Sequence, residues 1–463
     1  MPEPTVAIEQ QGIEHIPERD RHGLPWNLFT LWFASNVQLN AVVTGALAVY
    51  VGLDLTWAIV AILVGNLVGG LFMAYHSVQG SKLGIPQMIQ SRAQFGFRGA
   101  VLPMVITVVM YLGFATEGGV VAGRAIASIL GVSSPVGVVI FNVALLVIAL
   151  VGYDLIHSVS KALTVVSAVV FAALFVSLVA DLGSVAAGAP VAWQSVLLAI
   201  SIFAAWQITW APYVSDYSRY LPSSTPMSKT FWYTYLGSAL GAAFAMSIGA
   251  LAVLIAADAF GTDAVGFLSG RFPGVSALLV IALILSIVPA GAEGPYGAFL
   301  TSLSAISEHG RLNMSTANAR AVFVTAFTVV ATVLGIAASS DLLGTFLNIT
   351  LFLLYLLVPW TAINLTDYYF VRRGHYSIPE LFKRDGMYGF INWRVVMLYV
   401  VTIAVELPFI DSPLYVGPIA KELGFDIAWI LGLILPAVGY VVLVRRAADE
   451  PNRLVTGEAT ADG

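Results

Sequence analysis

The chain of 463 residues contains no cysteine, which excludes disulfides, thiol nucleophiles and cysteine-bound metal ions. Charged residues are also scarce, at 10% of the sequence, whereas hydrophobic residues make up 59% and the mean hydropathy is +0.88. A soluble globule needs more polar surface than this composition supplies. The sequence therefore predicts an integral membrane protein.

A concentrated basic segment is absent as well. The net charge is −5 and the charges are dispersed, so we expect no nucleic acid partner and no clamp for lipid head groups. Residues 1–26 carry charged side chains but no apolar core, unlike a secretory signal or a transit peptide. We therefore expect the N-terminus to stay in the cytoplasm.

Long apolar runs recur along the chain. Runs of about 20 residues suit transmembrane helices and are too long for barrel strands of about 10 residues. We place twelve spans at 28–52, 57–76, 100–130, 135–153, 162–181, 193–215, 231–257, 275–306, 319–338, 342–366, 394–410 and 424–444. This arrangement puts all but three of the 21 Lys and Arg residues on the cytoplasmic side, as the positive-inside rule requires. The sequence predicts a multi-pass protein of the plasma membrane with both termini in the cytoplasm.

No segment is long and polar enough for a soluble domain. We divide the chain into a cytoplasmic tail (1–26), a ten-helix core (27–373), a cytoplasmic loop (374–393), two further transmembrane helices (394–446) and a disordered cytoplasmic tail (447–463).

Two acids lie in the middle of apolar spans. Glu293 lies in the stretch 289–295, whose two prolines and two glycines predict a break in the helix, and Glu117 is followed by two glycines in the third span. A charge in hydrocarbon costs at least about 2.5 kcal/mol, so such acids usually face the protein interior or a water-filled cavity. We interpret both as functional acids, with structural hydrogen bonding as the alternative; for Glu117 the alternative partner is Arg124.

The first and sixth spans also contain helix-disrupting residues. Asn36, Gln38 and Asn40 cluster in the first span, and Trp206 to Trp210 precede Pro212 in the sixth. Interrupted helices five spans apart are typical of transporters built from inverted repeats, so the pattern predicts a five-plus-five repeat. The amides could also be hydrogen-bonding contacts between helices, and tryptophans are common in packing and at membrane interfaces.

Five motifs together resemble the nucleobase–cation symporter family of purine–cytosine permeases. They are Leu31–Ala34 with Gln38, Ser91–Gly99, Trp210–Tyr217, Thr345–Asn348 and Thr366–Gly374. The resemblance covers about residues 14–446. It implies an all-α, leucine-transporter-like fold of twelve helices, with the five-plus-five repeat followed by two C-terminal helices. It also implies import of a nucleobase or related heterocycle, such as cytosine or a purine, together with a cation.

The resemblance assigns site residues by position. It implies stacking by Tyr111 or Phe114 and by Trp206 or Trp210, amide contacts from Asn36 and Gln38, and acceptors at Glu117 and Glu293. Many relatives have amides where this chain has the two acids. An ionised carboxylate accepts hydrogen bonds but does not donate them, so we expect a ligand rich in N–H donors or a cationic ligand.

The coupling cation is also an expectation from the resemblance. Sodium-coupled relatives use backbone carbonyls that correspond to Ala34 and Val37, and hydroxyls at positions that are Pro289 and Ala290 here. Because those two side chains carry no oxygen, we favour a proton over sodium, with Glu117 or Glu293 as its carrier. We expect no metal and no cofactor. A sodium-coupled transporter of hydantoin, allantoin or a vitamin-like pyrimidine is the alternative, and so is a sensor that has lost transport.

Other classes fit less well. An enzyme would need a nucleophile–base pair or metal ligands at depth, but all six histidines fall at or near the predicted cytoplasmic face. A channel would need a continuous pore lining. Outside the candidate site, we expect Asp216 and Asp367 to anchor the cytoplasmic interface, with a gate role as an alternative, and Glu406 to contact water at the outer end of the eleventh span.

Overall fold

The structure, a computed structural model, describes residues 13–151, 153–184, 191–306 and 317–448. These residues are mostly α-helical. Their strands form one small antiparallel hairpin, β1 (Asp411–Ser412) with β2 (Tyr415–Val416). The prediction of an all-α protein is therefore confirmed.

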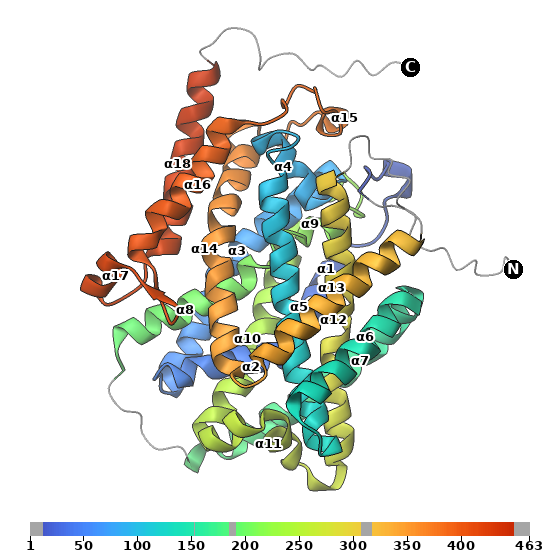
Figure 1. Cartoon of the computed structure of the whole chain (residues 1–463), viewed down its shortest axis with the longest axis vertical. Helices are drawn as coiled ribbons and strands as arrows, with labels where there is room; N and C mark the ends of the chain where they lie inside the picture. The colour runs from blue at the N-terminus through green and yellow to red at the C-terminus, as the bar shows by residue number, and fades with distance from the viewer. Residues whose placement is uncertain (1–12, 152, 185–190, 307–316, 449–463) are drawn as a thin grey trace, which may run out of the picture.

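Figure 1 shows the α-helices in chain order from blue to red. The first half contains α1 (Trp26–Asn36), α2 (Leu39–Tyr50), α3 (Leu55–Leu83), α4 (Gln87–Phe95), α5 (Val101–Leu130), α6 (Ser134–Val151) and α7 (Tyr153–Ala180). The second half contains α8 (Trp193–Ile208), α9 (Val214–Ser218), α10 (Met227–Thr262), α11 (Ala264–Gly270), α12 (Ser276–Ile306), α13 (Ala317–Ala338) and α14 (Leu342–Thr366). The chain continues with a π-helical turn η4 (Asp367–Val371), α15 (Ile378–Leu381), α16 (Trp393–Glu406), α17 (Pro418–Leu423) and α18 (Ala428–Ala448). Short 3-10 turns are η1 (Glu18–Asp20), η2 (Leu182–Ser184), η3 (Pro273–Val275) and η5 (Leu407–Phe409).

Each predicted span contains one long helix, except the first and sixth, which contain two helices each. Six helices in the described part of the chain have the length and apolar composition needed to cross a membrane. The count of twelve spans remains a prediction.

The first and sixth spans are broken, as predicted. Between α1 and α2, Val37 (φ −84°, ψ 73°) and Gln38 (φ −142°, ψ 161°) leave the helical conformation. Between α8 and α9, residues 209–213 form turns that include Pro212. Polar side chains compete for backbone groups, and proline lacks the N–H that an α-helix needs. The two breaks lie five spans apart, as an inverted repeat requires.

The predicted break at 289–295 is wrong. Residues 276–306 form one α-helix, α12, with Pro289 and Pro295 inside it. Proline removes one backbone hydrogen bond, but its fixed φ of about −65° is helical. Transmembrane helices tolerate it where neighbouring elements surround it, and α12 packs along α5, α6, α7 and α13.

Small residues allow some of the helices to approach closely. A β-carbon at Gly65 of α3 would lie 2.6 Å from Cβ of Phe203 in α8, and one at Gly241 of α10 would lie 2.6 Å from the carbonyl oxygen of Phe33 in α1. Close approach of backbones is how helices pack where the hydrophobic effect does not drive association. The broken first and sixth spans are thereby held against α3 and α10.

The last helices pack beside the core. α16 and α18 lie together on one flank and pack against α14, whereas α6 and α7 lie on the opposite flank (Figure 1). α4 and α15 lie at one end of the molecule and α11 at the other (Figure 1); we call these the α4 end and the α11 end.

Candidate functional site

The break in the first span is held open by side-chain amides. Asn36 is fully buried and donates to the carbonyl of Trp32 (2.8 Å) and to Oγ of Ser238 in α10 (3.1 Å). Gln38 donates to the carbonyl of Ser35 (2.9 Å), and the backbone N–H of Leu39 donates to Oγ of Ser286 in α12 (3.1 Å). These contacts fix α1 and α2 relative to the rest of the core.

The break in the sixth span is joined to that in the first. Nε1 of Trp206 donates to Oδ1 of Asn36 at 2.7 Å. Gln207 exchanges hydrogen bonds with Asn66 of α3 (2.8 Å) and Ser238 of α10 (2.6 Å). The polar groups of Asn36 and Trp206 therefore already form hydrogen bonds within the protein: Trp206 bonds to Asn36, and Asn36 also bonds to Trp32 and Ser238.

Aromatic rings fill the space beside the two breaks. The ring of Trp210 lies 5.5 Å from that of Trp32 and 5.7 Å from that of Tyr213. The predicted stacking residues of α5 lie there too. The ring centroid of Tyr111 is 5.2 Å from that of Tyr213, and the ring centroid of Phe114 is 6.0 Å from that of Trp206. The structure thus brings both predicted aromatic pairs together.

Glu117 lies in the interior of α5, and its carboxylate has no partner among the described residues. The residue is fully buried, and neither carboxylate oxygen accepts a hydrogen bond from that part of the chain. Arg124, the alternative partner, instead donates twice to the carbonyl of Ser339, at 3.1 and 2.8 Å. A buried charge without a partner is strongly disfavoured, so this position favours a protonated acid or a ligand that donates hydrogen bonds to the carboxylate.

Other polar atoms near the breaks also lack partners within the described ranges. They include the acceptors Gln38 Oε1 and Asn40 Oδ1 and the donors Trp32 Nε1, Trp210 Nε1 and Asn142 Nδ2. A β-carbon at Gly118 would lie 3.5 Å from Nδ2 of Asn40, and one at Gly119 would lie 3.0 Å from Nδ2 of Asn142. The turn that carries Glu117 therefore faces α2 and α6. Buried polar groups left unpaired cost about 1–3 kcal/mol each, and a polar ligand would remove that cost.

A cavity of about 430 Å³ lies toward the α11 end, between α2, α5, α10 and α11. Val43 and Val121 line it, about one helical turn beyond Asn40 and Glu117, together with Arg124 and Asp263. The cavity ends close to the unpaired polar groups.

The remaining predicted site residues are Glu293, the backbone cation ligands and the two positions that carry hydroxyls in sodium-coupled relatives. The side chain of Glu293 lies outside the described residues, so its place beside Glu117 stays a prediction. The carbonyl of Ala34, a predicted cation ligand with Val37, accepts the backbone N–H of Val37 at 3.2 Å. Pro289 and Ala290, which stand where sodium-coupled relatives have hydroxyls, lie within α12.

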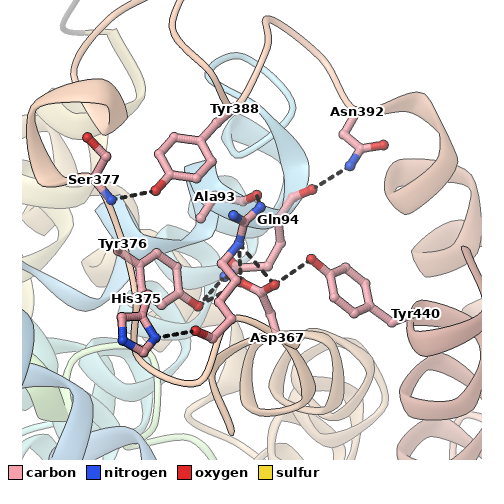
Figure 2. A network of polar contacts seen from close by, with 10 residues as sticks. Ala93, Gln94, Asp367, His375, Tyr376, Ser377, Tyr388, Asn392 and Tyr440 are labelled. Carbon is pink, nitrogen blue, oxygen red and sulfur yellow. Dashed lines mark hydrogen bonds and ion pairs between the residues drawn. The ribbon is translucent and has the colours of Figure 1, made fainter. Parts of the chain in front are cut away.

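A second buried acid, Asp367 at the α4 end, has all the partners that Glu117 lacks. It accepts hydrogen bonds from Gln94 (2.6 Å), Tyr376 (2.6 Å) and Tyr440 (2.8 Å) and pairs with Arg372 at 3.1 Å (Figure 2). Burial, reinforced by the Asp367 charge, raises the pKa of the Tyr376 phenol well above its usual value, so Tyr376 keeps its proton and donates it. This cluster joins α4, the loop after α14, and α18.

Sequence reasoning missed three members of the candidate site. Trp32 and Tyr213 lie within the family motifs, but only the structure shows that their rings are neighbours beside the two breaks. Asn142 is a buried amide in an otherwise apolar helix. A lone amide in a span was a usable signal, since polar residues at that depth mark contacts or sites.

A helical membrane protein with two broken helices that meet beside buried, unpaired polar groups is a secondary transporter of the inverted-repeat class. Comparison with known proteins agrees with this. Residues 15–432 match the family described as permease for cytosine/purines, uracil, thiamine, allantoin. The chain belongs to this family of nucleobase–cation symporters.

Similar sequences carry permease names. YxlA of Bacillus subtilis, assigned by name to the purine-cytosine permeases, is 40% identical over 95% of this chain and 96% of its own length. The purine-cytosine permease fcyB of Emericella nidulans is 24% identical over 95% of this chain and 88% of its own. These relatives are permeases and not enzymes.

The fold also has solved counterparts. Mhp1 in its inward-facing conformation superposes with a TM-score of 0.75 at 18% identity, with 95% of each chain covered. Mhp1 in a closed conformation with bromovinylhydantoin gives 0.73 at 21% identity, again with 95% of each chain covered. The predicted leucine-transporter-like fold is thereby confirmed.

Proposed function

We propose that this transporter imports a flat nucleobase, or a closely related heterocycle, together with a proton. The observation that carries the proposal is the fully buried Glu117, whose carboxylate finds no partner among the described residues beside two broken helices. A ligand in that position would supply the missing partner.

The chemistry of the unpaired atoms supports a ring with several N–H donors. Gln38 Oε1, Asn40 Oδ1 and the Glu117 carboxylate are acceptors, whereas Trp210 Nε1 is a donor. Aromatic faces at Trp210 and Tyr111 suit stacking on a flat ring. Aminopyrimidines and aminopurines, such as cytosine and adenine, combine an exocyclic amine, ring nitrogen atoms and a flat face.

The absence of side-chain oxygen atoms at two predicted sodium-ligand positions supports coupling to a proton. A sodium ion needs oxygen ligands, and Pro289 and Ala290 have none in their side chains. A desolvated carboxyl holds a proton more tightly than it does in water and can release it when the site opens. Glu117 is therefore our candidate proton carrier, with Glu293 as the second candidate.

A vitamin with a similar ring is the second candidate substrate. A relative named as vitamin B6 transporter TPN1 of Saccharomyces cerevisiae is 26% identical over 65% of this chain and 56% of its own. A pyridine or pyrimidine vitamin would use the same stacking faces and acceptors.

We further infer that the α4 end faces the cytoplasm, as the positive-inside rule requires. Arg92 and Arg372 lie at that end, and Arg124 beside the cavity near α11. The cavity would then give access from outside.

A thermal-shift screen of the purified protein tests the proposal. We expect cytosine, adenine or a related base to raise the melting temperature in a concentration-dependent way. The rise should change with pH and stay the same when sodium is replaced by choline. The Glu117→Gln variant should lose most of the shift. If hydantoins or vitamins alone stabilise the protein, the substrate assignment is wrong, and if sodium is required, the coupling assignment is wrong.

A further inference from the structure

Glu406, the last residue of α16, lies outside the candidate substrate site and is fully buried. The expectation that it contacts water is therefore wrong. The reason is the packing of α18, because Gly432 has no side chain and the Glu406 carboxylate occupies the space where a β-carbon would be. Val358 of α14 borders the same space.

Neither carboxylate oxygen of Glu406 has a hydrogen-bond partner within the described ranges. The titratable groups that interact electrostatically with it are Tyr355 of α14, Tyr399 of α16 and Asp426 just before α18. None of these is cationic, so they offer no counter-charge. An ionised carboxylate in such a place carries a penalty of several kcal/mol.

The neighbouring acid Asp426, in contrast, has several hydrogen-bond partners. Its oxygens accept the hydroxyl of Tyr355 and the backbone N–H groups of Asp411 (2.8 Å) and Ala428 (2.8 Å). Tyr399 donates no hydrogen bond to Glu406, because its hydroxyl donates to the carbonyl of Leu356 (2.7 Å).

Two acids that interact electrostatically in a buried site do not both ionise readily, and the one with more hydrogen-bond donors keeps the charge. Asp426 has three donors and Glu406 has none among the residues in view. We propose that Glu406 is a proton-binding site on the two helices outside the ten-helix core, and that loss of its proton weakens the packing of α18 on α16 and α14.

The effect extends to the ten-helix core because α18 is held at two levels, by the turn that follows α14 at one and by α16, beside Val358 of α14, at the other. Near the α4 end Tyr440 donates to Asp367 at 2.8 Å, and near the other end of α18 Glu406 lies against Gly432. The first contact is a hydrogen-bonded ion-pair cluster, and the second depends on a neutral carboxyl. A rise in pH would therefore loosen only the second.

The test compares melting temperatures of the purified full chain from about pH 6 to about pH 8. A folded state that holds a proton which the unfolded state has lost becomes less stable as the pH rises. We expect the wild-type melting temperature to fall by several degrees over this interval. Glu406→Gln, which resembles the protonated acid, should match the wild type at the lower pH and lose less on going to the higher pH. Glu422→Gln, a change at an exposed glutamate of α17, should behave as the wild type.

A variant that unfolds would leave the first test open, so a second measurement keeps Glu406 unchanged. Infrared spectra of the Glu117→Gln/Glu293→Gln double variant at neutral pH should retain the carbonyl band of a protonated carboxylic acid. Absence of that band would overturn the proposal. So would equal pH dependence in the wild type and Glu406→Gln, or a Glu406→Gln protein much less stable than the wild type at the lower pH.

Discussion

The acids Asp367 and Glu117 are both fully buried, yet their surroundings are opposite. Asp367 is surrounded by Gln94, Tyr376, Tyr440 and Arg372, whereas Glu117 meets no donor among the described residues. Satisfied buried networks rigidify a structure, and an unsatisfied polar group stands at a place where something else is required. Burial alone therefore does not separate a structural acid from a functional one, but the hydrogen-bond partners do.

The largest expected effect comes from emptying the satisfied site. Asp367→Ala leaves Arg372 without its ion pair and three donors without their acceptor, which should lower the free energy of unfolding by about 3 kcal/mol or more. The measurement is thermal or denaturant unfolding in detergent. Asp385→Ala, at an exposed acid of the same loop, is the matched control and should change little. Wild-type stability of Asp367→Ala would show that the cluster is not structural.

The converse change at the unsatisfied site should affect ligand binding and leave stability intact. Glu117→Gln should weaken binding of the nucleobase about 10- to 100-fold, because glutamine cannot share the transported proton with the base, and such a charge-assisted hydrogen bond contributes about 1.5–3 kcal/mol. Calorimetric titration measures this loss. The melting temperature without ligand should stay at the wild-type value or rise. A large drop in that temperature would assign Glu117 to structure.

Two tryptophans in the sixth span sharpen the same contrast. Nε1 of Trp206 is used by Asn36, whereas Nε1 of Trp210 has no acceptor in the described part of the chain. Trp206→Phe should cost about 1 kcal/mol of stability, and Trp210→Phe should instead weaken ligand binding by about five- to tenfold. Unfolding and binding measured on both variants decide the matter. Interchanged outcomes would contradict the site.

The smallest expected effect is that of sodium. Replacing sodium by choline should leave the ligand-induced rise in melting temperature unchanged, because Pro289 and Ala290 supply no side-chain oxygen. A dependence on sodium would indicate backbone ligands at Ala34 and Val37 that suffice without hydroxyls.

The sequence predicted the helical fold, both broken helices and the burial of Glu117, because hydropathy and helix-disrupting residues act locally. It failed at α12, where two prolines lie inside a helix that neighbouring helices support, and at Glu406, where Gly432 on the next transmembrane helix decides burial. It also could not tell that Asn36 is used by Trp206 while Gln38 Oε1 is not used among the described residues. Such pairings depend on contacts between spans far apart in sequence.

Uptake into proteoliposomes under imposed gradients tests the central claim most directly. With labelled cytosine or adenine and no sodium, an inward proton gradient should drive accumulation by the wild type, and Glu117→Gln should not accumulate the base under that gradient. Accumulation driven by a sodium gradient alone, or undiminished proton-driven accumulation by Glu117→Gln, would contradict the assignment of this buried acid as proton carrier.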